Sequence, residues 1–220
     1  MLAVLTYLRQ LAARVGRMAE LIPHEGDLEP DGDYEALLFA DASFDEAAAE
    51  NARFLDSAFR NMTLDRCTLR KCRFTGVTMK DVRIVGTDLA ETGWQDVTLT
   101  GCALAGVQAH SARWRRVGFV DGKLDSVNFR GGALTDVRFE NCLLRDADFS
   151  HAALLRVSFA GCTLTGADFT KATCTDVDLR GATLGIAAGF DALRGTTIDS
   201  VQLVTLAPQL ADHLGIMVED

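Results

Sequence analysis

The residues of this chain that could carry chemistry are its histidines, its cysteines and its closely spaced aspartates. Two carboxylates on one surface can serve as general acid and general base, and the pairs Asp146/Asp148 and Asp176/Asp178 have a suitable spacing. The histidines are scattered along the chain, at His24, His110, His151 and His213. We find no catalytic arrangement among these groups, because the aspartates fill ordinary polar positions of a repeat described below.

The sequence also lacks the motifs that hold cofactors and metals. It contains no glycine-rich phosphate-binding loop and no dinucleotide fingerprint. Its six cysteines have neither the Cys-x-x-Cys nor the Cys/His spacing of a zinc site. We therefore expect no enzyme, no cofactor and no metal, which leaves binding and scaffolding functions.

The element that organises the chain is a repeat of five residues. From Phe39 to Leu184, the 30 residues at intervals of five are apolar, and they include both tryptophans and eleven of the twelve phenylalanines. A second phase lies two residues earlier in each repeat and is small at 28 of 30 positions, the exceptions being Leu37 and Met62. Each repeat therefore points one large and one small side chain inward.

This period excludes a single helix and a single straight strand. Five residues of an α-helix advance the side chain by a net 140°, which would spread the large residues around the whole axis. In a strand, side chains alternate with period two, so an odd repeat would send successive large residues to opposite faces. A chain that turns a corner in every repeat remains. The glycine, aspartate and asparagine residues two places after many centres suit such corners.

Residues 147–151 (ADFSH), 167–171 (ADFTK) and 177–181 (VDLRG) resemble the pentapeptide-repeat motif of a small, a polar, a Leu or Phe and two further polar residues. The resemblance covers about two-thirds of the chain. It implies an all-β fold, a right-handed quadrilateral β-helix of about seven to eight coils with twenty residues in each coil. Residues n and n + 20 would then stack, and we expect columns such as Phe119, Phe139 and Phe159, or Phe74, Trp94 and Trp114.

The flanking segments are expected to close the rod. Residues 1–33 combine an amphipathic helix over 2–22, which Pro23 ends, with an acidic connector; the repeat domain covers 34–198. After Leu184 the phase slips by one residue, and residues 199–220 are predicted to form a C-terminal helix and cap, with a final strand at 216–218. The first helix lacks the features of a signal peptide and is too charged to span a membrane, so we expect a cytoplasmic protein without membrane contact.

The cysteines are predicted to be packed free thiols. Five of them occupy the small inward phase and Cys174 a large one, where they act as small apolar residues. Cys142 and Cys162 lie twenty residues apart and should be neighbours on successive coils. A disulfide between these two remains an open alternative, although a reducing compartment disfavours it.

The chain resembles, in particular, the DNA-mimicking fluoroquinolone-resistance proteins, which comprise the mycobacterial type and its Qnr relatives. That resemblance implies a protein partner, a type II topoisomerase (DNA gyrase), no direct contact with nucleic acid, and a homodimer through the C-terminus. The net charge of −9 agrees with a DNA mimic, since phosphates dominate how DNA is held. The extended loops of the Qnr subgroup are absent from this sequence.

The acidic charge gathers at the two ends of the chain. Residues 34–60 carry six acidic and two basic side chains, whereas residues 61–115 carry five acidic and eight basic ones, including Arg113, Arg115 and Arg116. The candidate partner-binding residues are Asp41, Asp45, Glu46, Glu50, Asp56, Asp191, Asp199 and Asp212. The candidate dimerisation residues are Phe190, Val201, Leu203, Leu206, Leu210 and Leu214. Because no side of the rod is strongly acidic, a scaffolding repeat protein with another protein partner stays open as the alternative.

Overall fold

The fold is built on one left-handed backbone residue in every five. In the computed structural model, which describes residues 21–219, every fifth residue from Asp31 to Gly181 has a positive φ. L-residues avoid this conformation, and glycine, asparagine and aspartate tolerate it best. Each such residue turns the chain sharply, so four short straight segments return it to its starting side after twenty residues. The corner residues that the sequence suggested are therefore confirmed.

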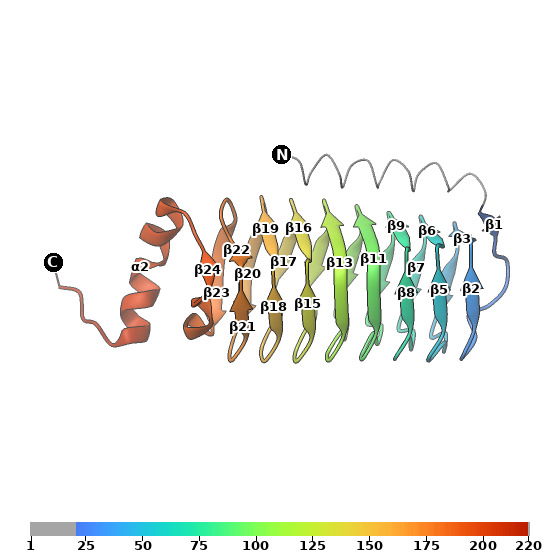
Figure 1. Cartoon of the computed structure of the whole chain (residues 1–220), viewed down its shortest axis with the longest axis horizontal. Coiled ribbons are helices and arrows are strands. Elements are labelled where there is room, and N and C mark those ends of the chain that lie inside the picture. Colours follow the sequence, from blue (N-terminus) through green and yellow to red (C-terminus); the bar gives the residue numbers. More distant parts are fainter. Residues whose placement is uncertain (1–20, 220) are drawn as a thin grey trace.

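The coils stack into a rod with four sides, which we number in chain order (Figure 1). Sides 1 and 2 belong to one 16-stranded sheet, because β11 and β13 pass through the corner between them; side 3 is an eight-stranded sheet.

Side 1 consists of β2 (Asp33–Glu35), β5 (Arg53–Leu55), β8 (Arg73–Thr75), the first halves of β11 (Gly93–Thr100) and β13 (Arg113–Val120), β15 (Ala133–Thr135), β18 (Ala153–Leu155) and β21 (Thr173–Thr175). Side 2 consists of β1 (Ile22–Pro23), β3 (Leu37–Ala40), β6 (Ala58–Arg60), β9 (Thr78–Lys80), the second halves of β11 and β13, β16 (Arg138–Glu140), β19 (Ser158–Ala160), β22 (Val177–Asp178) and β24 (Thr196–Thr197). Side 3 consists of β4 (Ser43–Asp45), β7 (Thr63–Asp65), β10 (Arg83–Val85), β12 (Ala103–Ala105), β14 (Lys123–Asp125), β17 (Leu143–Arg145), β20 (Thr163–Asp168) and β23 (Thr183–Ala188).

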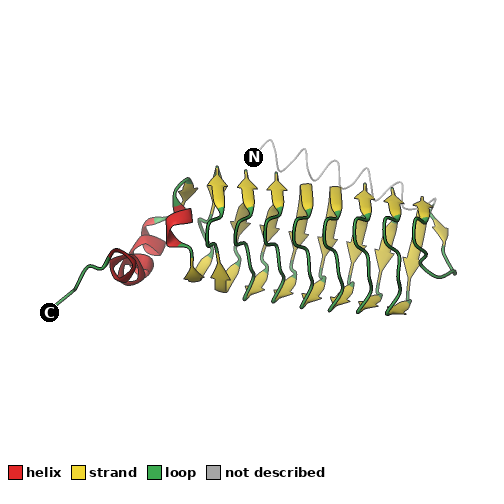
Figure 2. Ribbon diagram, turned by 90° about the horizontal axis from the view of Figure 1, so that it is seen from below, coloured by secondary structure: helices red, strands yellow, loops and turns green. Residues whose placement is uncertain are grey.

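Side 4 is narrower, and it is held by single bridges instead of strands. These bridges join Ala48, Thr68, Asp88, Gln108, Asn128, Asp148 and Asp168. Throughout the rod the pairing is parallel. Between the two end coils residue n pairs with residue n + 20, as Trp94 does with Trp114. The predicted coil of twenty residues, with about eight coils in all, is confirmed (Figure 2).

The core is a set of side-chain columns that run along the rod. The rings of Trp94 and Trp114 stack with centroids 4.4 Å apart, and those of Phe139 and Phe159 stack at 5.0 Å. The small inward phase is buried beside them, for example at Val137 and Val157. Because identical positions repeat at the strand spacing, aromatic rings meet face to face with an offset, which is a favourable arrangement. The predicted columns are thus observed.

The N-terminal end is closed by a strand. β1 pairs with β3, and the backbone N–H groups of Ile22 and His24 donate to the carbonyls of Ala36 and Leu38. The predicted helix over 2–22 lies mostly outside the described residues, but its proposed end at Ile22 is wrong. Ile22 is extended because Pro23 removes a helical donor and because the open edge of the first coil offers backbone partners.

The C-terminal end is closed by helix α2 (Ser200–Leu214), which follows a 3₁₀ turn, η2 (Phe190–Leu193). Asp199 caps α2 in a capping box with Gln202, and Gly215 ends it in a left-handed conformation. The Gln202 side-chain amide also donates to the carbonyls of Leu179 and Ala182, both at 2.6 Å. The last coil is one residue short, since Val177 pairs with Thr196, which confirms the predicted slip in phase. The strand predicted at 216–218 does not form, because these exposed residues follow the helix with no strand beside them.

We expect Phe139→Ala to destabilise the rod strongly. The Phe139 side chain is completely buried between Phe119 and Phe159, so truncation should cost about 3–5 kcal/mol of the free energy of unfolding. Chemical denaturation followed by circular dichroism measures this loss, with Phe139→Leu as a control of closer volume that should cost less. An alanine variant as stable as the wild type would contradict the packed column.

Candidate protein-binding surfaces

The closely spaced aspartates serve the backbone. Asp148 Oδ1 accepts a hydrogen bond from the Ser150 N–H at 2.7 Å, and Asp178 does the same for Arg180 while it binds the Arg180 guanidinium. That guanidinium holds the pKa of the Asp178 carboxyl below its usual range. Asp146 is a left-handed corner residue whose carboxylate lies over the glycine corner of the next coil, Gly166. These contacts give the aspartates roles in turns and explain their spacing without catalysis.

The histidines and carboxylates do not converge on a metal site. Within residues 21–219, no group of three or more His, Cys, Asp or Glu side chains could hold a metal ion. His213 contacts Asp191 at 3.1 Å near η2, while His110 and His151 lie at different coils. The described part of the chain also has no helix of the length and apolarity needed to cross a bilayer.

The cysteines are buried free thiols. The Cys72 Sγ donates to the Ala49 carbonyl at 2.8 Å, and burial raises the pKa of the Cys72 thiol to about 12. Burial likewise raises the pKa of Cys102 to about 11. Cys142 and Cys162 are neighbours as expected, with the Cys142 backbone N–H 3.4 Å from the Cys162 Sγ. Burial therefore leaves the Cys72 and Cys102 thiols protonated and poor nucleophiles.

The surface carries ladders of arginine and carboxylate that join successive coils. Arg116 makes two hydrogen bonds of 2.7 Å to Asp96, and Arg156 binds Asp136 at 2.6 and 2.9 Å. The two residues of each pair are twenty apart in the sequence and therefore lie on successive coils. The Arg156 guanidinium lowers the pKa of the Asp136 carboxyl. Exposed pairs of this kind add little to stability, but each also cancels a negative charge on the side of the rod.

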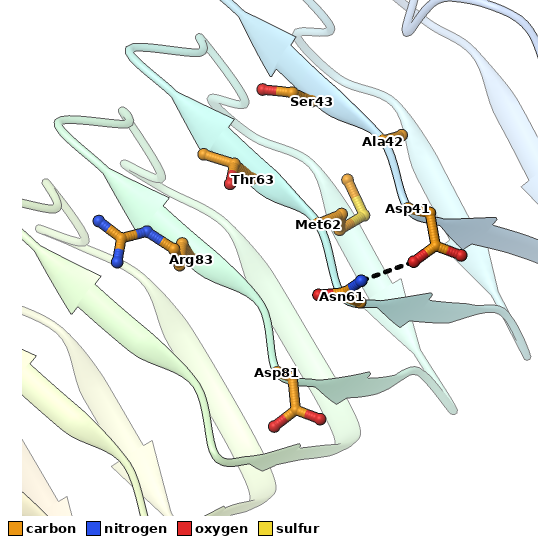
Figure 3. Close-up of a pocket in the computed structure, with 8 residues that line it drawn as sticks. All are labelled: Asp41, Ala42, Ser43, Asn61, Met62, Thr63, Asp81 and Arg83. Atoms are coloured by element: carbon orange, nitrogen blue, oxygen red, sulfur yellow. Dashed lines mark hydrogen bonds between the residues drawn. The ribbon is translucent and has the colours of Figure 1, made fainter.

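The predicted acidic residues near the N-terminus are exposed, and they divide into two groups. Arg66 reaches Asp45 at 2.6 Å and Glu46 at 3.1 Å, and it also binds Asp65 at 3.0 Å. This single guanidinium offsets one of the three negative charges around it. Asp41 keeps its charge, because its partner is the neutral amide of Asn61, which donates at 2.6 Å. Figure 3 shows this contact at the edge of a shallow groove of about 270 Å³, in which Arg83 extends away from Asp41 and Asp81.

The other predicted acidic positions lie on side 4, at a corner and around α2. Glu50 and Asp56 are exposed, and no ion pair joins either to another described residue. Asp199 is used as the cap of α2, where the Gln202 backbone N–H lowers the pKa of its carboxyl. Asp191 lies beside His213, and Asp212 is exposed on α2. The structure therefore brings Asp191, Asp199 and Asp212 to the same end of the rod, whereas Asp41, Asp45, Glu46 and Glu50 lie near the other.

Helix α2 presents apolar side chains to solvent at the end of the rod. Of the predicted dimerisation residues, Val201, Leu203 and Leu214 are 74%, 52% and 70% exposed. Leu206 is buried against the rod, and Phe190 and Leu210 are partly buried against the core, so these three attach η2 and α2 to the last coil. Val204, Ile216, Met217 and Val218 are also exposed, although they are not among the predicted dimerisation residues. Residues three apart lie on the same face of a helix, so the sequence could have placed Val204 beside Val201 in the predicted contact.

Comparison with known proteins identifies the repeat. The family profile described as "Pentapeptide repeat region" matches residues 52–129 and 132–203, over which the coils of twenty residues and their buried Leu and Phe centres are observed. This chain belongs to the pentapeptide-repeat family. A comparison with curated proteins gives no match.

Among solved structures, this pentapeptide-repeat protein is similar to full-length QnrB1, a plasmid-mediated fluoroquinolone-resistance protein. The two share 13% identity and a TM-score of 0.39 over 81% of this chain and 99% of QnrB1. HetL, involved in regulating heterocyst differentiation in the cyanobacterium Nostoc, is 19% identical with a TM-score of 0.23 over 88% of this chain and 96% of HetL. A pentapeptide-repeat protein of the Arabidopsis thaliana thylakoid lumen is 15% identical, with a TM-score of 0.38 over 56% of this chain and 72% of that protein. We take no function from these likenesses.

The raised cysteine pKa values lead to a simple test. At pH 8 a thiol whose pKa is about 11 or 12, such as that of Cys102 or Cys72, is a thiolate in about one molecule in a thousand or fewer. Because all six cysteines are also buried, the native protein should not react with Ellman's reagent. After unfolding in guanidinium we expect six reactive thiols per chain. Four thiols would instead reveal a disulfide between Cys142 and Cys162, and rapid labelling of the native protein would contradict the buried positions.

Proposed function

We propose that this pentapeptide-repeat protein is a non-enzymatic DNA mimic, which binds a type II topoisomerase, DNA gyrase, and modulates it or protects it from inhibitors such as quinolones. The observation that carries the proposal is the exposed apolar surface of α2 at one end of an uninterrupted rod. Two copies joined there would form a rod of twice the length. A long straight rod is the shape that a protein needs in order to occupy a site built for duplex DNA.

The distribution of carboxylates supports the same proposal. Asp191, Asp212 and Glu219 lie on or beside the α2 end, and among residues 185–219 Arg194 is the one basic residue other than His213. Joining two copies through α2 would therefore gather negative charge at the middle of the dimer. Positively charged DNA-binding surfaces hold anionic groups through this kind of long-range attraction.

A scaffolding rod that binds a different protein is the second candidate, and the arginine ladders favour it. Arg66, Arg116 and Arg156 each neutralise carboxylates along the sides, so the density of free negative charge there is well below that of duplex phosphates. In this reading, the partner contacts the apolar end of the rod, or its sides, through shape and hydrogen bonds.

A supercoiling assay separates the two candidates. Micromolar protein should inhibit gyrase, or restore supercoiling in the presence of a quinolone. The charge-reversed variant Asp191→Lys/Asp212→Lys should be at least 10-fold less effective, while Glu140→Lys at mid-rod should retain most of the effect. No change in gyrase activity with or without the drug would exclude the DNA-mimic proposal and leave the scaffold.

Dimerisation through α2 is tested independently of gyrase. The variant Val201→Asp/Val204→Asp should convert a dimer, twice the 23.8 kDa mass of the chain, into a monomer in light scattering, because it places charge in an apolar contact. The control Gln209→Asp changes an exposed polar residue of the same helix and should leave the dimer intact. If the double variant has the wild-type mass, the contact lies elsewhere.

A further inference from the structure

A basic groove crosses the corner between sides 4 and 1 in the first half of the rod. It has a volume of about 680 Å³ and spans four successive coils, which at about 4.8 Å per coil is roughly 14 Å along the axis. Its walls are formed by Asn51, Lys71, Arg73, Glu91, Thr92, Gly93, His110, Ser111 and Arg113. The sequence analysis noted the basic run that begins at Arg113, but the proposed function does not use it.

The groove owes its depth to a missing side chain. In the side 1 strands, Arg73, Gly93 and Arg113 are in register on three successive coils. The position between the two arginines is therefore a glycine, and a Cβ added to Gly93 would meet no atom within 4 Å. Gly93 does not have the left-handed φ that favours glycine. The gap is thus an open space between two arginine positions whose backbones are about 10 Å apart.

The cations of the groove are not neutralised by the rod itself. Within residues 21–219, no ion pair or side-chain hydrogen bond engages Lys71, Arg73 or Arg113, and all three are exposed. The one carboxylate of the wall, Glu91, is bound by Arg70 at 3.0 Å, a residue outside the groove. This corner therefore differs from those at which Arg116 and Arg156 are paired with an aspartate of the preceding coil.

The neighbouring arginines are engaged elsewhere and do not belong to this site. Arg116 forms its two hydrogen bonds with Asp96, and Arg115 lies close enough to Asp136 to help lower the pKa of that carboxyl. Three positive side chains and the Ser111 hydroxyl remain around the gap at Gly93.

We propose that this groove is a binding site for a phosphate group, held as a dianion between Arg73 and Arg113, with Lys71 and Ser111 alongside. A phosphate monoester carries about −1.5 to −2 charges and three acceptor oxygens. Its charge and its number of acceptors match three cations and a hydroxyl better than those of a carboxylate ligand do. Guanidinium groups bind phosphate oxygens in pairs, and two guanidinium groups that face each other across a gap can do so from both sides. The site goes beyond the proposed DNA mimicry, because a protein that imitates the phosphates of DNA does not need to bind a phosphate group itself.

Isothermal titration of the full-length protein with inorganic phosphate, ATP and a phosphoserine peptide tests the site and distinguishes its sources. Potassium acetate at matched ionic strength is the control ligand. Two variants change the groove by different means. Arg73→Ala/Arg113→Ala removes charge, whereas Gly93→Gln fills the gap and keeps every cation. A variant with glutamine at this outward-facing strand position should fold, since other coils carry arginine or alanine there. Arg60→Ala, which removes an exposed arginine of side 2, is the matched control.

The expected result is saturable binding of at least one phosphate compound and none of acetate. Binding should weaken at least 10-fold in both groove variants and stay unchanged in Arg60→Ala. The compound bound most tightly identifies the source as a free phosphate, a nucleotide or a phosphorylated protein. The proposal would be overturned if no phosphate compound binds at millimolar concentration, if acetate binds equally well, or if the groove variants bind like the wild type.

Discussion

The whole molecule depends on one backbone constraint, a left-handed residue at every fifth position. That residue fixes the length of each side at a few extended residues and returns the chain to the same side after twenty. Outside glycine, the conformation costs up to about 1–2 kcal/mol at each corner, and the use of aspartate and asparagine at many corners reduces that cost. Stacked aromatic columns and continuous parallel pairing offset what remains, so local strain and global packing are coupled in every coil.

Because residue n lies beside residue n + 20 through all but the end coils, the same register governs the surface. An aspartate at a corner has the next corner as its neighbour, which is how Arg116 meets Asp96 and Arg156 meets Asp136. Where the next corner is glycine, as at Gly166, the carboxylate of Asp146 lies over it instead. The chain can therefore place or cancel charge at one coil without altering its neighbours, and both acidic ends and a basic groove can exist on a rod with little net charge on any side.

The periodic part of the structure was predictable from the sequence because burial repeats with the backbone. The columns through Trp94 and Phe139, the corners and the slip in phase after Leu184 all follow from a single apolar period. Features without a period were harder to predict. The extended state of Ile22 depends on the open edge of the first coil, and the burial of Leu206 depends on how α2 docks. The gap at Gly93 becomes visible only when outward-facing residues twenty apart are compared, and hydrophobic patterning carries no information about those positions.

The two hydrogen bonds that the Gln202 amide makes to the last coil have a consequence for assembly. A stack of identical coils has no inherent length, since every exposed backbone edge is a template on which another coil, or another molecule, can add. The Gln202 side chain engages the carbonyls of Leu179 and Ala182, so these two groups cannot pair with a further coil. A residue outside the repeat, Gln202, therefore helps to keep the protein a discrete particle and not a fibre.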